Sequence, residues 1–497
     1  MNSARLRYSG IILVASKSLG VVTGMLFTMI VTRRLMVEEF GVWQYVTVLF
    51  SYFILPSSFT GFWITRHAAR GEKLATTGLL LNMLFSIPST MLFVIASTMA
   101  SSVAATSPIF FQVISPQISL MYLLSIFEAV ASGVKPQLLG YGSAFFEFAK
   151  IGIGAILVLN MRLGLIGALL SVEIAYALQV VFMAIMLREE FSRSFSKEAA
   201  KKWIMLAWIP LFSQLSFQMQ QFDSIITTFI TSSTIPIAML KAAQVFTAVV
   251  SFSVYAASAL YPRLLAGVGD GDIVTSIKLV SLLAIPSMFG ALVLAEPLLA
   301  VLRREYVYAA LALRISVITT TIVAISSVAE TAVLATERID VSGNVNFRKY
   351  LRSKLALFPI LGFAYDAVYL TAVYFVVRYL SAIGAQPVSI AAAIALVALI
   401  VTIPLASYKW ILSRRVVSLK FPLKSIASYT LAAAIMSLTI LFLNPSEAIS
   451  TEIGKVIFGI IPKIVAGGAV YILLITILDD EPRTIFKGLI RKIRRSA

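Results

Sequence analysis

Apolar stretches recur almost without pause between residues 9 and 478 of this chain. Most are roughly 20 residues long, the length that a helix needs to cross the hydrocarbon core of a bilayer. The polar intervals between them are too short to hold a soluble domain. We therefore predict an all-α polytopic membrane protein.

The composition also requires lipid as the solvent. Hydrophobic residues make up 59% of the 497 residues and charged residues 13%, and the mean hydropathy is +0.93. The net charge of +18 would indicate nucleic acid binding in a soluble protein, but in a membrane protein it is explained by basic cytoplasmic loops. The chain has no cysteine and one histidine, His67. We therefore predict no nucleic acid partner, no cofactor, no metal site and no catalytic residue.

Apolar runs bounded by charged residues or by Pro and Gly predict about fourteen spans, in two sets of six and a final pair. The first set is expected near 9–32, 40–63, 76–100, 108–133, 140–161 and 163–187. The remaining spans are expected near 203–230, 234–260, 273–301, 307–335, 355–379, 384–408, 421–444 and 455–478.

Basic residues gather on alternate loops. With a cytoplasmic N-terminus, the inner side holds the clusters 188–202, 338–354 and 409–424 and the tail 483–495, whereas the outer loops hold few cations. The positive-inside rule therefore predicts that both termini are cytoplasmic, in a multi-pass protein of the cell membrane.

Two stretches of the chain echo each other. FGVWQYVTVLF from Phe40 and MLKAAQVFTAVV from Met239 each begin a span at the outer side, carry an early glutamine and lead to a basic, glycine-containing inner loop. Such repeats are typical of transporters in which two lobes move around a central site. We predict an N-terminal six-helix lobe at 1–190, a C-terminal six-helix lobe at 200–410, two additional helices at 421–478, and a basic amphipathic cytoplasmic tail at 480–497.

Several short motifs follow one another in a defined order over residues 1–345. TRRLMVEEFGVWQY, at 32–45, carries Arg33 and the pair Phe40-Gly41, and SFQMQQFDSIITTFI carries Asp223. A further motif, SSFTGFWITRHAARGE, lies between these two, and YPRLLAG and REYVYAALALRI follow the second. Together they resemble the signatures of the polysaccharide and oligosaccharidyl-lipid flippases, a family of the MOP superfamily that also contains the multidrug and toxin extruders. Met36 and Val37 replace that family's usual Gly-Pro.

This resemblance implies two six-helix lobes, two extra helices and translocation of a lipid-linked oligosaccharide by alternating access, for polysaccharide or glycoprotein assembly. Its implied partners are an oligosaccharide on a polyprenyl or dolichyl phosphate, and membrane lipid. Because the chain has no GxxxxGK[ST] sequence, ATP hydrolysis is not expected. An H⁺ or Na⁺ gradient, the membrane potential, or consumption of the substrate on the far side would supply the energy.

Cations at membrane depth are candidates for binding the substrate phosphate. An ionisable side chain there costs about 2.5–3.5 kcal/mol on insertion scales, which favours a functional role. We expect Lys17, Lys150 and Arg314 to contact the phosphate, with Lys241 as a further substrate-binding candidate. Two simpler interpretations stay open: Glu147 can neutralise Lys150 at i, i+3, and Lys241 can extend to the membrane surface.

The expected seventh span is unusually polar. Gln214, Gln218 and Gln221 stand at i, i+4 and i+7, which places them on one face of a regular helix. We predict that they line the passage and bind the sugar, although such amides can also link helices within the bilayer. Asp223, in the same span, and Asp366, in the eleventh, are predicted to be ion-coupling residues.

Two other functions compete with the flippase. A cation-coupled multidrug extruder of the same superfamily would use an anionic cavity, with Asp223 and Asp366 as its coupling sites. An integral-membrane glycosyltransferase or polymerase would need a sizeable extramembrane loop with a pair of acids or histidines, and the chain has no such loop. We therefore predict a transporter and not an enzyme.

Overall fold

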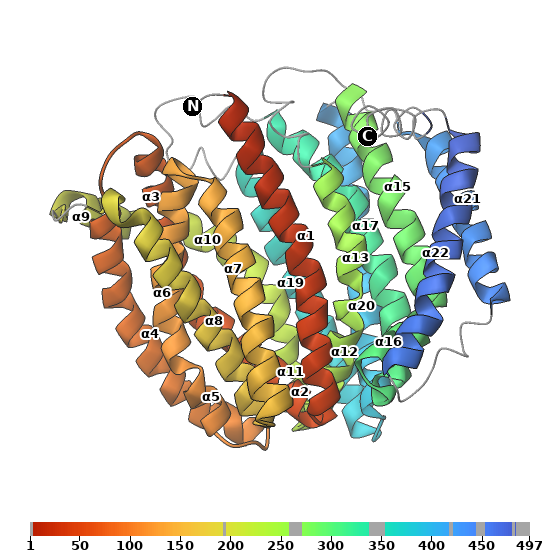
Figure 1. Cartoon of the computed structure of the whole chain (residues 1–497), viewed down its shortest axis with the longest axis horizontal. Helices are drawn as coiled ribbons and strands as arrows, with labels where there is room; N and C mark the ends of the chain where they lie inside the picture. The colour runs from red at the N-terminus through yellow and green to blue at the C-terminus, as the bar shows by residue number, and fades with distance from the viewer. Residues whose placement is uncertain are drawn as a thin grey trace. The chain divides into compact units, whose positions relative to one another are not determined.

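The computed structural model describes residues 3–191, 195–257, 271–336, 353–416, 421–443, 453–479 and 483, and every regular element in these ranges is a helix (Figure 1). Eleven helices of this described part are long and apolar enough to span a membrane. The number is twelve if Ile235–Val245 and Thr247–Ala257, bent by 41° at their junction, form one broken span. The predicted all-α, multi-pass membrane protein is confirmed.

Two compact units divide the chain. The first unit contains Met1–Ala238 and Gly362–Pro387, and the second contains Met239–Leu361 and Val388–Ala497. Each unit therefore combines two separate stretches of sequence. The predicted lobes at 1–190 and 200–410 follow the order of the spans along the chain and stay a prediction of domain organisation.

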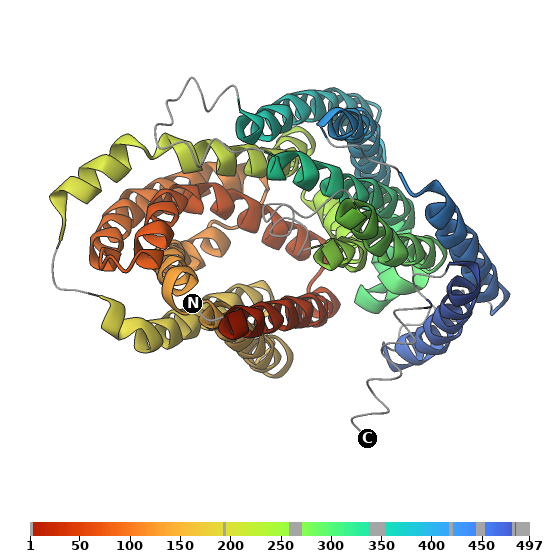
Figure 2. The same ribbon diagram turned by 90° about the horizontal axis from the view of Figure 1, so that it is seen from above.

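The first unit is built mainly of long helices. Its elements are α1 (Ser3–Arg34), α2 (Val37–Ile54), α3 (Ser58–Ala69), α4 (Ala75–Val103), α5 (Ile109–Val113), α6 (Ser115–Val134), α7 (Gln137–Gly154), α8 (Gly164–Leu187), α9 (Lys197–Met205), α10 (Trp208–Gln218), α11 (Phe222–Thr231), the start of α12 (Ile235–Val245) and most of α19 (Lys354–Ala382). Helix α1 packs along α7, as Figures 1 and 2 show from two directions.

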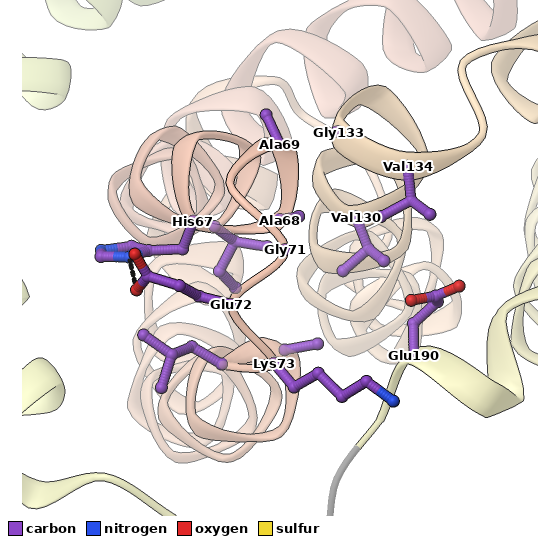
Figure 3. A pocket seen from close by; sticks show the side chains of 13 residues that line it. His67, Ala68, Ala69, Gly71, Glu72, Lys73, Val130, Gly133, Val134 and Glu190 are labelled. Carbon is purple, nitrogen blue, oxygen red and sulfur yellow. Dashed lines mark hydrogen bonds and ion pairs between the residues drawn. The ribbon is translucent and has the colours of Figure 1, made fainter. Parts of the chain in front are cut away.

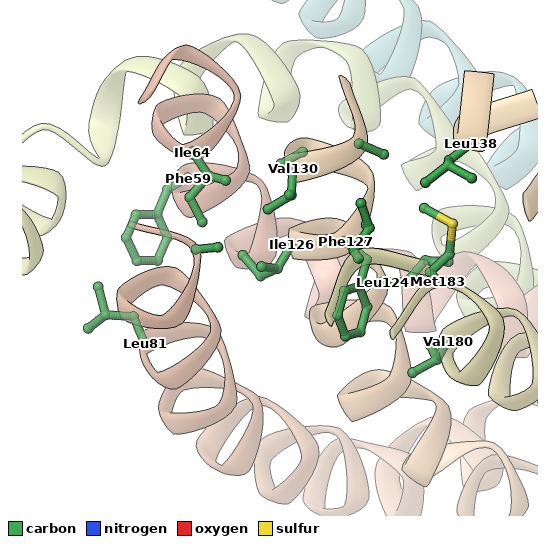
Figure 4. Close-up of a cluster of buried hydrophobic side chains, with 14 of the residues drawn as sticks. Phe59, Ile64, Leu81, Leu124, Ile126, Phe127, Val130, Leu138, Val180 and Met183 are labelled. Atoms are coloured by element: carbon green, nitrogen blue, oxygen red, sulfur yellow. The ribbon is translucent and has the colours of Figure 1, made fainter. Parts of the chain in front are cut away.

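One apolar core joins six helices of this unit, α3, α4, α6, α7, α8 and α9. Phe59 and Ile64 of α3, Leu81 of α4, Ile126 of α6 and Met183 of α8 all lie in it (Figure 4). Ile126 and Met183 are fully buried. Trp203 of α9 belongs to the same cluster, so this short helix is held against the spans by apolar packing.

The Phe-Gly pair of the motif at 32–45 lies near the start of α2. The backbone amide of Met36 donates to Glu39 Oε2 at 2.8 Å, which caps α2. Glu38 and Glu39 lie in the first turn, where their negative charges interact favourably with the positive end of the helix dipole. Phe40 is fully buried. A Cβ on Gly41 would stand 2.4 Å from the carbonyl oxygen of Thr234, so only glycine permits this approach.

Replacing Gly41 with alanine is therefore expected to destabilise the fold by about 1–3 kcal/mol, the usual range for overpacking. Gly152→Ala on α7 is the matched control, because a Cβ there meets no atom within 4 Å. Thermal unfolding of the purified proteins in detergent measures the difference. Equal midpoints for the two variants would contradict the close contact between α2 and Thr234.

The second unit contains α13 (Thr247–Ser251), α15 (Gly271–Val293), α16 (Ala295–Leu302), α17 (Ala310–Ala335), α20 (Pro387–Val416), α21 (Leu423–Phe442) and α22 (Ile453–Leu478). The last two correspond to the final pair of expected spans, and both are long and apolar enough to cross a membrane. They pack with α15 and α16 around Tyr429, Met436 and Ile460. Tyr471 donates its hydroxyl to the carbonyl of Leu282 at 2.9 Å.

Three expected spans are not among the eleven candidates, and one of them, at 234–260, corresponds to the bent pair Ile235–Val245 and Thr247–Ala257. The first, at 9–32, lies within the 32-residue α1. The seventh, at 203–230, is not the continuous helix that we predicted: α9 ends at Met205, α10 begins at Trp208, and a 3₁₀ turn, η4 (Met219–Gln221), separates α10 from α11. The predicted amphipathic tail lies outside the described residues, apart from Arg483.

Candidate functional site

A buried cluster of acids and tyrosines forms where α2, α11 and α19 meet η4 within the first unit. Asp223 lies in the first turn of α11 and is 4% exposed, and Asp366 lies on α19 and is 3% exposed. Tyr52 of α2 and Tyr369 of α19 are both within electrostatic range of the two carboxylates. The structure thus places the two predicted ion-coupling residues around the same tyrosines.

Direct hydrogen bonds hold Asp223. Tyr369 donates its hydroxyl to Asp223 Oδ2 at 2.7 Å, and Ser224 donates to Oδ1 at 2.9 Å. The ring of Tyr369 stacks on that of Tyr365, with centroids 5.9 Å apart. Gln220 Nε2 donates in turn to the Tyr365 hydroxyl at 3.4 Å. Tyr365 and Tyr369 are one helical turn apart and present one face of α19 to this site.

The break in the seventh span is part of this site. At η4 the amide of Phe222 donates to the carbonyls of Met219 and Gln220, and the hydroxyl of Tyr52 donates to the carbonyl of Gln218 at 3.1 Å. The Gln218 side chain also donates to Ser51 Oγ of α2. Because a backbone carbonyl left unpaired at membrane depth is costly, Tyr52 compensates for the interruption.

Helix α19 approaches α10 closely beside the break. A Cβ on Gly362 would stand 2.5 Å from Ser216 Oγ, so the glycine lets the two helices touch. The rings of Phe212 and Phe363 pack at 4.9 Å next to this contact. Asp366 follows Gly362 by one turn, and the close approach thereby fixes the depth of its carboxylate beside α10.

The described part of the chain gives neither carboxylate a basic partner. Within the residues that the structure describes, Asp223 and Asp366 form no ion pair with lysine or arginine. Thr227 is one turn from Asp223 on α11, and its hydroxyl is buried without a hydrogen-bond partner. Two buried carboxyl groups without a fixed cation are stable only when protonated or when a mobile cation neutralises them.

Lys150 lies in a second buried network of the first unit. Its ammonium is 2.7 Å from Glu147 Oε2, and Thr23 of α1 donates to the same oxygen at 2.6 Å. The aromatic rings of Phe27 and Phe146 lie beside the ammonium, with centroids at 5.5 and 4.9 Å. The local neutralisation by Glu147 is therefore present, and contact of Lys150 with a phosphate stays a prediction.

The other predicted cations are distributed over both units. Lys17 lies on α1, and its side chain is outside the described residues. Lys241 is half-buried on α12 in the second unit. Arg314 of α17 donates to Glu296 Oε1 at 3.0 Å and to the carbonyl of Leu292 at 3.2 Å, also in the second unit. Lys17 and Lys150 thus belong to the first unit, and Lys241 and Arg314 belong to the second.

The three predicted glutamines of the seventh span stand on two elements: Gln214 and Gln218 lie in α10, and Gln221 ends the 3₁₀ turn η4. Gln214 is exposed, whereas Gln218 and Gln221 are half-buried. Their role in substrate binding stays a prediction.

Sequence reasoning missed five residues of the acidic site. Tyr52, Ser224, Thr227, Tyr365 and Tyr369 were not predicted, although Tyr365 and Tyr369 flank Asp366 at helical spacing in an apolar span. That polar triplet is a local signal that could have identified them. Tyr52 has no such signal, because its partner Gln218 is 166 residues away.

A separate pocket of about 380 Å³ lies at the turn between α3 and α4 (Figure 3). Ala68 and Gly133 form part of its wall, and His67 contacts Glu72 at its rim through Nδ1 and Oε2, 2.7 Å apart. Lys73 and Glu190 also line it. It contains none of the predicted site residues.

The helical architecture is that of a multi-pass membrane protein. No family model and no curated protein matches the sequence. Among solved structures, the lipid II flippase MurJ in an inward closed conformation superposes with a TM-score of 0.68 at 14% identity, covering 97% of this chain and 100% of that one.

Multidrug resistance MATE transporters of the MOP superfamily are also similar. An inward-facing structure gives a TM-score of 0.57 at 12% identity and covers 80% of this chain and 94% of that one. An outward-facing structure gives 0.53 at 13% identity, with coverages of 83% and 96%. The chain therefore has the fold of MOP-superfamily transporters and flippases.

Proposed function

We propose that this protein is a flippase that moves a lipid-linked oligosaccharide across the cell membrane by alternating access. The observation that carries the proposal is the superposition over 97% of the chain with a lipid flippase, against 80 to 83% for the MATE transporters. The motif resemblance at 32–45 and around Asp223 supports the same substrate class. The flippase resemblance also implies two additional C-terminal helices, and the chain has α21 and α22 in that position.

The substrate brings a phosphate or pyrophosphate and many hydroxyl groups through the bilayer. Cations along the passage, for which Lys17, Lys150, Lys241 and Arg314 are our candidates, would stabilise the phosphate. The amides of Gln214, Gln218 and Gln221 would bind sugar hydroxyls. The polyprenyl or dolichyl tail can remain in the hydrocarbon throughout.

Asp223 and Asp366 are proposed to couple flipping to H⁺ or Na⁺. Among the described residues the two carboxylates have no basic partner, the hydroxyl of Tyr369 donates to Asp223, and Thr227 follows Asp223 by one turn of α11. Such an oxygen-rich, anionic site suits a small hard cation or a proton. Its occupancy would change the charge that α11 and α19 present to one another.

A reconstituted flipping assay with defined lipid-linked sugars, with and without H⁺ and Na⁺ gradients, tests the proposal. Gradient-dependent movement of the glycolipid is the expected result. The buried acidic pair and the MATE-like fold also suit the second candidate, a cation-coupled multidrug extruder. Transport of cationic dyes without movement of glycolipid would establish that function instead.

The proposed orientation places both termini in the cytoplasm. The chain has no cysteine, so single cysteines report their location without background labelling. Ser232→Cys, at an exposed turn after α11, should react with an impermeant thiol reagent added from outside. Glu198→Cys, exposed on α9, should react only after the inner side is opened. The reverse pattern would invert the topology.

A further inference from the structure

Helix α9 is a short surface helix between α8 and α10. It packs against α3 and α4 of the first unit. In Figure 1 it lies beside these two helices, at the edge of the molecule. Its inner face consists of Ala200 and Trp203, which are 6% and 1% exposed and belong to the apolar core of that unit. The helix therefore has one face fixed to the protein and one face that is exposed among the described residues of the first unit.

Three contacts fix the position of α9. The backbone amide of Ser196 donates to Thr77 Oγ1 of α4 at 3.0 Å, and Ser196 Oγ accepts from the amide of Ala199 at 3.2 Å as a helix N-cap. The ring of His67, near the end of α3, lies 5.6 Å from that of Trp203. These anchors make α9 a built element of the unit.

The same contacts place α9 at the level of a membrane surface. The candidate span that contains α3 ends at Ala69, and the next begins at Ala75 with α4. His67 and Thr77, which touch α9, lie within three residues of those two ends. A helix attached to the ends of two spans lies where lipid headgroups meet water.

The outer face of α9 interleaves basic and apolar side chains. Lys197, Lys201 and Lys202 are exposed, as are Ile204 at 49% and Met205 at 67%. None of the three lysines forms an ion pair within the described part of the chain, and the only acid on α9 is Glu198. At 100° per residue, Ile204, Lys197, Lys201 and Met205 occupy one continuous sector of the helix.

This pattern matches the boundary between headgroups and acyl chains. Large apolar side chains facing water on both sides of a lysine are unfavourable, whereas at a membrane surface they enter the acyl boundary and the ammonium groups remain among the headgroups. The net charge of +2 on α9, from three lysines and Glu198, selects anionic over zwitterionic headgroups.

We infer that the outer face of α9 is a docking surface for anionic phospholipid headgroups, with Ile204 and Met205 inserted beside them. The inference concerns the membrane partner of the first unit and is independent of the transported substrate. It predicts that each lysine contributes about a fivefold preference for an anionic surface, as expected for a basic residue near such a membrane.

A single-cysteine variant, Met205→Cys, carrying an environment-sensitive fluorophore tests the docking. The full-length protein is placed in nanodiscs of zwitterionic lipid, with or without anionic phospholipid, and quenching by lipids spin-labelled near the headgroup is measured. Quenching that increases with anionic lipid is expected. Ser107→Cys, in the exposed turn beyond the opposite end of α4, is the control and should not respond to lipid charge.

Variants of the three α9 lysines test whether the label is quenched because these charges bind anionic lipid, or only because α9 lies near the membrane. Lys197→Gln/Lys201→Gln/Lys202→Gln should remove the dependence of quenching on anionic lipid, whereas the corresponding triple arginine variant should retain it. A label that is unquenched in both membranes would overturn the inference, as would quenching that is independent of lipid charge. The arginine variant keeps the test decisive if the glutamine variant folds poorly.

Discussion

Replacing Asp223 with asparagine should reduce gradient-driven flipping at least tenfold. Asparagine is nearly isosteric and can still accept the hydrogen bond from Tyr369, so the substitution removes charge with little change of shape. A cation bound between Asp223 and Asp366 would lose one of two charged ligands, and a loss of about 1.4 kcal/mol already means a tenfold weaker site. Rates in proteoliposomes with imposed H⁺ or Na⁺ gradients measure the effect.

Two comparisons make the result specific. Tyr369→Phe removes one hydrogen bond to the carboxylate but keeps both charges, so its effect on gradient-driven flipping should be smaller than that of Asp223→Asn if the charges bind the ion. Glu305→Gln in the second unit removes a surface acid paired with Arg303 and should leave the gradient dependence unchanged. Asp223→Asn protein that is folded, abundant and still fully gradient-dependent would exclude ion coupling at this site.

The long helices could be predicted from hydropathy because the bilayer sets their length. Helices α4, α8 and α21 lie close to the expected spans at 76–100, 163–187 and 421–444. The signal is local: each span needs only its own apolar residues to be stable in lipid. The same reasoning could not assign the chain to the two compact units, since these depend on contacts between distant segments.

The break at η4 shows where a local pattern fails. The glutamines at 214, 218 and 221 have regular helical spacing, yet the helix is interrupted at Met219–Gln221. The interruption is stabilised by Tyr52 from a segment far away in sequence. Nothing within the seventh span itself encodes that partner, so tertiary contacts override the local periodicity.

Part of the candidate site could be predicted from the sequence, because ionisable residues within apolar spans are costly and therefore conspicuous. Buried acids are rare in spans, and their cost singles out Asp223 and Asp366 without any structure. Pairing of Lys150 with Glu147 followed from their i, i+3 spacing. Thr23 could not be predicted as the second partner of Glu147, because the contact between α1 and α7 joins residues 124 positions apart.

The second large effect is expected when the cations proposed to line the passage are removed. The combined variant Lys17→Gln/Lys150→Gln/Arg314→Gln should lower glycolipid flipping at least tenfold, because an anion crossing a low-dielectric region needs fixed positive partners. Dispersed cations also release the phosphate more easily than one tight site would. Flipping of a lipid-linked sugar in proteoliposomes is the measurement, alongside protein abundance and thermal stability.

The ion pairs determine the control for this experiment. Lys150→Gln leaves Glu147 buried without its cation, and Arg314→Gln leaves Glu296 without its partner, so lost stability could imitate lost transport. Adding Glu147→Gln and Glu296→Gln to the combined variant removes those uncompensated charges. If flipping stays low in this restored, stable protein, the cations act on the substrate; if flipping returns to the parental rate, they serve only to balance their acids, and the cationic passage is wrong.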